Sequence, residues 1–155
     1  MGCYNLGNEE RENMNRIYDA LDMACLTCQP AMIRGLTGSG KTAIVRQWLE
    51  EHPQYNGVWF DAADLVARTP SIDAKRRKKT DLTLIGQKFT ADEIELMRKP
   101  DTIIVVDNYH LLDNETKSHV LLLCDRFVVD ESEEYPFVEL PDVITVCAIA
   151  TDCCE

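Results

Sequence analysis

The sequence contains no apolar run long enough to cross a lipid bilayer. Its longest apolar stretches, residues 102–106 and 120–124, are far shorter than the roughly 20 residues that a membrane-spanning helix needs. It also opens without the charged, apolar and small-residue segments of a secretory signal. Met1-Gly2-Cys3 resembles the start of a myristoylation signal, but Leu6 stands where that signal has Ser or Thr. We therefore expect a cytoplasmic protein with no membrane partner.

Basic residues are scarce. The 155 residues include 16 Lys and Arg against 27 Asp and Glu, which gives a formal net charge of −11. Such a chain repels nucleic acid on average, so contact with DNA or RNA requires a local basic patch. The one dense basic run is Lys75-Arg76-Arg77-Lys78-Lys79. This run is either a solvated surface segment or the contact for a nucleic-acid or acidic protein client, and both interpretations stay open.

A disulfide framework is not expected either. The seven cysteines are an odd number with no leader before them, which favours reduced intracellular thiols. Cys25 and Cys28 have the spacing of zinc ligands, and Cys153 and Cys154 offer two further thiolates. However, adjacent cysteines fit paired zinc loops poorly, and Cys25 and Cys28 continue the apolar stripe of a helix. We therefore interpret these two as buried thiols, with a zinc site as the alternative.

The rest of the sequence alternates helical and strand patterns. Apolar spacing and capping residues predict helices over residues 9–28 and 42–51, and two more that begin near Thr90 and at Asp113 or Asn114. The last of these is expected to bury Val120, Leu121, Cys124 and Phe127. Short apolar runs predict strands over residues 31–34, 58–61, 102–106 and 143–149. Strands that alternate with helices predict a three-layer α/β fold with a mostly parallel sheet of at least four strands.

A complete phosphate-loop motif follows the first predicted strand. It reads Gly35-Leu36-Thr37-Gly38-Ser39-Gly40-Lys41-Thr42 and matches G-x-x-x-x-G-K-[ST] in full. Its glycines let the backbone turn tightly, so that N–H groups point at phosphate oxygens, and the next helix adds its dipole. Lys41 supplies an ammonium to the β- and γ-phosphates, and the Thr42 hydroxyl can ligate Mg²⁺. The loop, with Ala43 directly after it, predicts binding of a nucleoside triphosphate and Mg²⁺.

A second motif agrees with the first. The apolar strand predicted over residues 102–106 ends in Asp107. A carboxylate at the end of such a strand can hold Mg²⁺ through water beside the phosphate loop. We therefore predict that Thr42 and Asp107 form the metal site.

From about Ala31 onward, the sequence resembles the nucleotide-binding core of AAA+ ATPases. The resemblance rests on the order of the phosphate loop, a second strand, the strand ending in Asp107, a helix, and a strand ending in Thr151-Asp152. The MoxR-like branch is the most similar, because Leu140-Pro141-Asp142 stands between a charged connection and the last strand. The resemblance implies a P-loop NTPase sandwich of the AAA+ type over residues 31–155, with residues 1–30 as an amphipathic helix packed on it.

The resemblance also implies a function. The nucleotide is ATP, which agrees with the lack of an Asn-Lys-x-Asp guanine motif, and hydrolysis to ADP remodels a protein or nucleic-acid partner. Lys41 and Asp107 belong to the catalytic site, and Thr151 or Asp152 is the first sensor of the γ-phosphate. In this family the segment after the second strand commonly faces the client, which favours a client contact through Lys75–Lys79.

Asn108 departs from the family pattern. The family has Glu after the metal-binding Asp, and that Glu activates the attacking water. An amide cannot accept the proton as a carboxylate does, so we expect slow hydrolysis. The alternative function is an ATP-binding switch or structural module with little or no hydrolysis. A small-molecule kinase on the same scaffold needs an acceptor pocket and an arginine-bearing lid, for which the sequence gives no signal.

The length is a second departure. The sequence stops after the sensor strand, whereas the family strand order 5-1-4-3-2 includes a fifth strand. Without that strand, the phosphate-loop strand lies at the sheet edge, and an exposed edge invites pairing with another chain. We therefore expect a homo-oligomer or a subunit completed by a partner chain, unless the sequence is a fragment or a divergent minimal protein.

Overall fold

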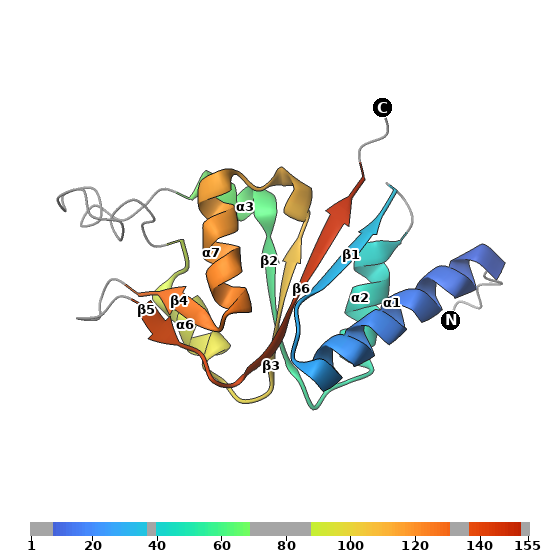
Figure 1. The fold of residues 1–155 in the computed structure, drawn as a ribbon, viewed down its shortest axis with the longest axis horizontal. Coiled ribbons are helices and arrows are strands. Elements are labelled where there is room, and N and C mark those ends of the chain that lie inside the picture. The colour runs from blue at the N-terminus through green and yellow to red at the C-terminus, as the bar shows by residue number, and fades with distance from the viewer. Residues whose placement is uncertain (1–7, 37–39, 69–87, 131–136, 153–155) are drawn as a thin grey trace.

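The computed structural model describes residues 8–36, 40–68, 88–130 and 137–152. The helices are α1 (Asn8–Thr27), α2 (Lys41–Glu50), α3 (Ala62–Ala67), α6 (Ala91–Met97) and α7 (Asn114–Cys124), with a short 3-10 helix η1 (Tyr109–Leu111). The strands are β1 (Ala31–Gly35), β2 (Asn56–Asp61), β3 (Thr102–Asp107), β4 (Phe127–Val129), β5 (Phe137–Glu139) and β6 (Val143–Thr151). Helices and strands alternate along most of the chain, as predicted (Figure 1).

The main sheet has four parallel strands in the order β1-β6-β3-β2. Its register places Asp61 of β2 opposite Asp107 of β3, and Gly35 of β1 opposite Thr151 of β6. Because parallel strands run in one direction, their carboxyl ends meet at the same edge of the sheet, where ligands bind in open α/β folds. The predicted α/β fold with a parallel sheet is confirmed.

The burial of each strand follows its sequence. All six residues of β3 are buried, as expected of an apolar strand that has neighbours on both sides and helices on both faces. In β1, Ile33 is buried whereas Met32 and Arg34 are exposed. Among the described strands, β1 pairs only with β6 and therefore lies at the edge of the sheet.

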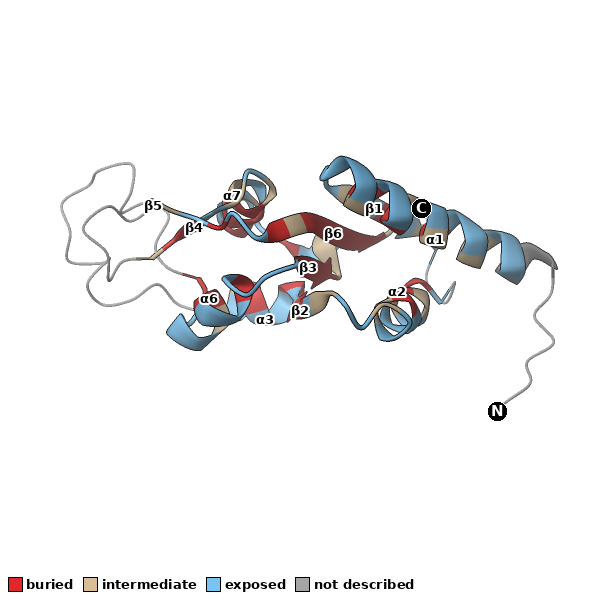
Figure 2. Cartoon of the chain, turned by 90° about the horizontal axis from the view of Figure 1, so that it is seen from below, coloured by how far each residue is buried: buried red, intermediate tan, exposed pale blue. Residues whose placement is uncertain are grey.

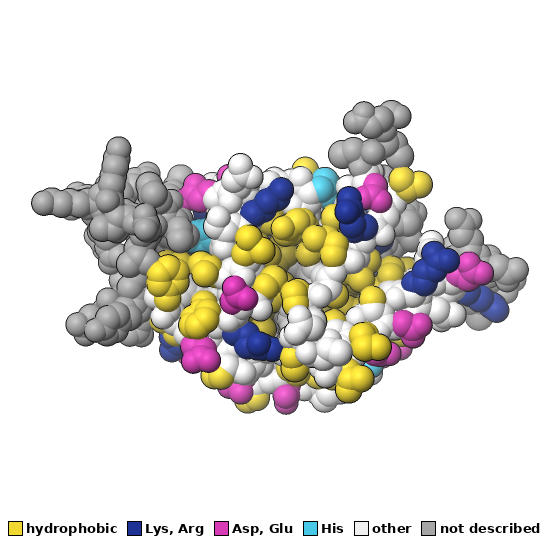
Figure 3. Space-filling view, in the orientation of Figure 1, with side chains coloured by type: hydrophobic (Ala, Val, Ile, Leu, Met, Phe, Trp, Pro, Cys, Tyr) yellow, Lys and Arg dark blue, Asp and Glu magenta, His cyan; other side chains and the backbone are white. Residues whose placement is uncertain are grey.

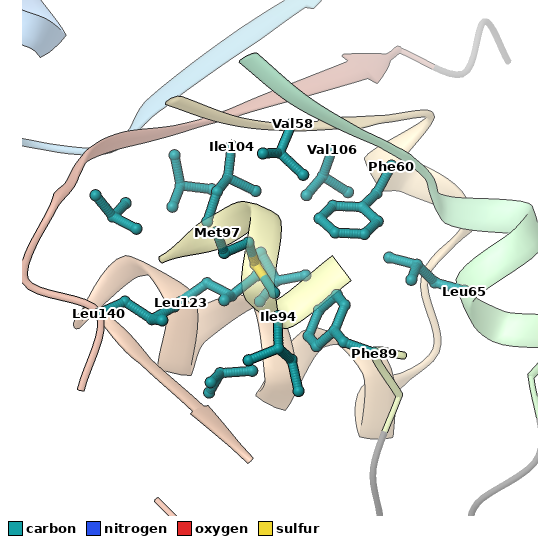
Figure 4. Close-up of a cluster of buried hydrophobic side chains, with 14 of the residues drawn as sticks. Val58, Phe60, Leu65, Phe89, Ile94, Met97, Ile104, Val106, Leu123 and Leu140 are labelled. Carbon is teal, nitrogen blue, oxygen red and sulfur yellow. The ribbon is translucent and has the colours of Figure 1, made fainter. Parts of the chain in front are cut away.

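Two hydrophobic clusters join the sheet to its helices. On one face, Leu21 of α1 and Trp48 of α2 pack with Ile103 and Val105 of β3. On the other face, the cluster includes residues of α3, α6 and α7 with Ile104 and others of the sheet (Figure 4). Figure 2 shows the buried residues running along the sheet between these two layers of helices. The described part of the chain is therefore a three-layer sandwich, and none of its helices is long and apolar enough to span a bilayer.

The helix predicted to begin near Thr90 is α6, and a capping box forms its start. The backbone N–H of Glu93 donates to Thr90 Oγ1 at 3.2 Å, and the Thr90 N–H donates to Glu93 Oε1 at 2.9 Å. The Glu93 carboxylate also accepts two hydrogen bonds from the guanidinium of Arg68, at 2.6 and 2.9 Å. This network joins the end of α3 to the start of α6.

The predictions for the last helix are partly wrong. Asp113 caps α7, because its Oδ1 accepts a hydrogen bond from the N–H of Thr116 at 2.8 Å. Val120 is buried, but the side chain of Leu121 is 61 % exposed, since neighbouring residues of a helix point about 100° apart. The helix ends at Cys124, and Phe127 begins β4, which pairs with β5 in an antiparallel hairpin that the sequence did not reveal.

Candidate nucleotide-binding site

A cavity of about 460 Å³ opens at the carboxyl edge of the sheet. Most of its lining residues belong to the predicted site: Gly40, Lys41, Thr42, Ala43, Asp107, Asn108 and Thr151. Arg46 and Ile149, which the sequence did not single out, complete the wall. Thr37, Gly38 and Ser39 lie outside the described residues. A smaller cavity of about 290 Å³ adjoins the first at Lys41 and contains Gly35 and Leu36 in its wall.

The last glycine of the loop starts the helix. Gly40 has a φ of 81° and caps α2, a backbone conformation that glycine adopts without a steric penalty. Because α2 begins at Lys41, its first backbone N–H groups and the positive end of its dipole face the loop. Such a helix end attracts anions, and phosphate in particular.

Lys41 bonds back to the residues at which the motif begins. Its side chain is buried, and the ammonium donates to the carbonyl oxygens of Gly35 at 3.1 Å and Leu36 at 2.8 Å. These bonds connect Lys41, near the end of the motif, to Gly35 and Leu36 at its start. They hold the positive charge of Lys41 beside the first residues of the motif.

Thr42 and Asp107, the two predicted metal ligands, lie in contact with each other. The Thr42 hydroxyl lies 3.1 and 3.2 Å from the two carboxylate oxygens of Asp107, although the residues come from different elements. Asp107 is buried and also accepts the N–H of Asn108 at 2.9 Å. A hydroxyl and a carboxylate are hard oxygen donors that fit Mg²⁺, which takes its other ligands from water and phosphate.

Asn108 contacts a carboxylate that the sequence did not reveal. Its φ of 58° is left-handed, and its Nδ2 donates to Asp61 Oδ2 at 3.3 Å. The other oxygen of Asp61 accepts the N–H of Ala63 at 2.8 Å and caps α3. Asp61 is adjacent because β2 and β3 end at the same level in the sheet. The position of Asp61 at the end of the second predicted strand is the sequence feature that could have placed it near Asn108.

The structure separates the two sensor candidates. Thr151 lines the cavity, and its N–H donates to Nδ1 of His110 at 3.1 Å. Asp152 does not line it; the Asp152 carboxylate faces Arg34, with Nε at 3.2 Å and Nη2 at 3.1 Å. Asp152 instead supports the loop through its N–H, which donates to the carbonyl of Gly35 at 2.8 Å. No sequence motif pointed to His110.

The cysteines form no metal site among the described residues. Burial raises the pKa of the Cys147 thiol to about 12 and also raises the pKa of the half-buried Cys25. Both are therefore protonated, unreactive thiols at neutral pH. The prediction that Cys28 is buried is wrong, because Cys28 lies exposed just after the end of α1. Cys153 and Cys154 lie outside the described residues.

A parallel sheet with a phosphate-loop motif between β1 and α2 defines a P-loop fold. No protein-family model and no curated protein matches the sequence. Similar solved structures include the RuvB Holliday junction branch migration motor of Thermotoga maritima (14 % identity, TM-score 0.47) and a Pif1 helicase described in DNA unwinding (16 % identity, TM-score 0.48). The matches cover 94 % and 96 % of this chain but 39 % and 34 % of those chains. The likeness concerns the fold alone.

Proposed function

We propose that this chain is an ATP-binding ATPase core of the AAA+ type, of the MoxR-like branch, that uses Mg²⁺. The observation that supports the proposal best is the meeting of the Thr42 hydroxyl with the Asp107 carboxylate, beside the buried ammonium of Lys41. These groups come from two distant motifs, and the fold brings together the donors that a triphosphate and its metal require. The resemblance to AAA+ proteins supports ATP over other nucleotides.

Each residue has a role in this proposal. The loop amides and Lys41 bind the β- and γ-phosphates, and Thr42 and Asp107 hold the metal. When bound, Mg²⁺ neutralises charge on the β- and γ-oxygens. Thr151, in the cavity wall, would lie next to the γ-phosphate of a bound triphosphate, while Asp152 supports the loop from outside the cavity.

Hydrolysis transfers the γ-phosphoryl group to water. The bond from the γ-phosphorus to the β–γ bridging oxygen breaks, a bond to the water oxygen forms, and ADP and phosphate leave. The amide of Asn108 can orient this water but cannot take its proton, so turnover is slow or depends on assembly. The energy remodels a protein or nucleic-acid client, with Lys75, Arg76, Arg77, Lys78 and Lys79 as its contact. This basic run lies outside the described residues, and the client proposal rests on its sequence.

The second candidate function is an ATP-binding switch or structural module with little hydrolysis. The contact between Asn108 and Asp61 favours it, because the amide that replaces a catalytic carboxylate is held by a neighbouring acid. Both candidates require ATP binding and differ only in turnover.

Replacement of Lys41 by Ala tests the binding that both candidates share. We expect the affinity for ATP·Mg²⁺, measured by calorimetry, to fall about a hundredfold, because a buried charge-assisted contact to phosphate is lost. Lys99→Ala is the matched control, since Lys99 is exposed beyond α6 and does not line this cavity. Equal affinity of Lys41→Ala and the wild type would refute the proposal.

A further inference from the structure

Among the described residues that line the candidate nucleotide cavity, Arg46 is the second cation, and it lies outside the phosphate-loop motif. It lies on α2 one helical turn after Thr42, so the two side chains share a face of the helix. Long helical side chains lean toward the helix N-terminus, and Arg46 therefore extends toward the turn that carries Thr42. In the described wall, the charges of Lys41 and Asp107 offset each other, so Arg46 makes the wall net positive.

Trp59 of β2 holds this guanidinium. The Cζ atom of Arg46 lies 4.1 Å from the centre of the Trp59 ring. A guanidinium carries five N–H donors, more than one cation–π contact with a ring can engage, so donors remain for a further partner. Within the part of the chain that the structure describes, Arg46 has no ion pair or hydrogen bond. A preformed cation with available donors therefore faces the cavity.

The position of Trp59 places Arg46 near the metal residues. In the sheet, Trp59 pairs with Val105, just before the paired ends Asp61 and Asp107. The cavity wall contains Arg46 together with Asp107 and Asn108, whereas Gly35 and Leu36 line the other cavity. Thr42 and Asp107 would hold the metal that accompanies a bound triphosphate, so the terminal phosphate would lie on the side of the cavity nearest Asp107.

We propose that Arg46, oriented by Trp59, binds the terminal phosphate and makes the site prefer a triphosphate to a diphosphate. This inference rests on the proposed nucleotide binding. A guanidinium can donate two charge-assisted hydrogen bonds to one phosphate. This contact therefore strengthens binding of the terminal phosphate, which ADP lacks. Trp59 is a positioning residue that acts through Arg46.

Calorimetry with the β,γ-imido analogue of ATP and with ADP, both with Mg²⁺, tests the assignment. We expect Arg46→Gln to weaken binding of the analogue about tenfold, since it loses charged hydrogen bonds, and to leave ADP affinity within about twofold. Arg46→Lys, which keeps the charge but not the planar fork, should lose less. Trp59→Leu should weaken analogue binding in the same direction by a smaller factor.

Arg98→Gln is the matched control, because Arg98 is exposed at the end of α6 and outside this cavity. Unchanged affinities of Arg46→Gln, or an equal loss for both nucleotides, would overturn the role of Arg46. If Lys41→Ala loses affinity for both the analogue and ADP, the proposed nucleotide binding is still supported, whatever Arg46→Gln does. Normal binding by Lys41→Ala would instead refute the proposed function itself. Circular dichroism identifies an unfolded variant, and Arg46→Lys then provides the same comparison.

Discussion

In the function that we propose, the residue at position 108 decides whether a bound triphosphate is also cleaved. In the AAA+ proteins that the sequence resembles, a Glu at this position acts as the base. Here the structure places the side chain of residue 108 next to Asp61, with Nδ2 3.3 Å from Oδ2. A carboxylate at position 108 would therefore face another carboxylate, and like charges in contact disfavour each other's ionisation. A Glu introduced at position 108 should therefore act as a base more effectively when Asp61 is replaced as well.

Single-turnover hydrolysis of Asn108→Glu with and without Asp61→Asn tests this. We expect the double variant to exceed the wild-type rate about a hundredfold, as a positioned general base gives, and the single variant to gain less. Asn at position 61 keeps an oxygen to cap α3, so the helix start is preserved. Equal rates for the wild type and the double variant would show that the missing carboxylate does not limit turnover.

At the scale of elements, the contact between Arg68 and Glu93 makes the junction of α3 and α6 sensitive to pH. Burial of Glu93 opposes its charged form, but hydrogen bonds from Arg68 and Thr90 outweigh burial and lower the pKa from its ordinary 4.5. Because the folded-state pKa is the lower one, this stabilisation is complete above the unfolded-state pKa. It is lost as the pH falls below that value.

Replacement of Glu93 by Gln removes this pH-dependent stabilisation. We expect the wild type to have a larger free energy of unfolding than Glu93→Gln. The difference should be constant at about pH 6 and should shrink as the pH falls to about 3. Urea unfolding at several pH values measures the difference. A difference that stays constant over that range would contradict the assigned ion pair.

The elements that the sequence predicts are those with a local signal. The phosphate loop is one continuous motif, and the capping box at Thr90 lies within a single turn. By contrast, α3 and the hairpin of β4 and β5 are too short to show a period. The contacts of Asn108 with Asp61 and of Arg46 with Trp59 depend on how β2 and α2 lie beside β3, which no local pattern contains.

At the scale of the whole molecule, a net charge of −11 opposes contact with nucleic acid. Any client of this kind must therefore bind through a local basic segment. Changing Lys75, Arg76, Arg77, Lys78 and Lys79 to Gln should weaken binding of single-stranded DNA or RNA and flatten its dependence on salt. The control is a variant with Lys99, Arg98 and Arg16 changed to Gln, because these residues do not belong to the run. An unchanged salt dependence in the first variant would exclude the basic run as the contact.

The open side of β1 is the surface that we propose for assembly. Met32 is 47 % exposed on this strand, and Figure 3 shows hydrophobic side chains gathered on the face over β6 and β1. An unpaired strand edge next to an apolar face favours contact with another chain. We expect the mass in solution, measured by light scattering, to rise with ATP·Mg²⁺ and to stay unchanged for Lys41→Ala. A monomer under both conditions would contradict homo-oligomerisation.

The same edge strand ends at Gly35, whose carbonyl accepts hydrogen bonds from Lys41 and Asp152. A neighbour that adds a strand beside β1 therefore contacts the element that leads into the phosphate loop. Thermodynamic linkage then works in both directions: if nucleotide tightens the association, the associated form holds nucleotide more tightly by the same factor. Local concentration of the protein would thus regulate how much nucleotide it retains.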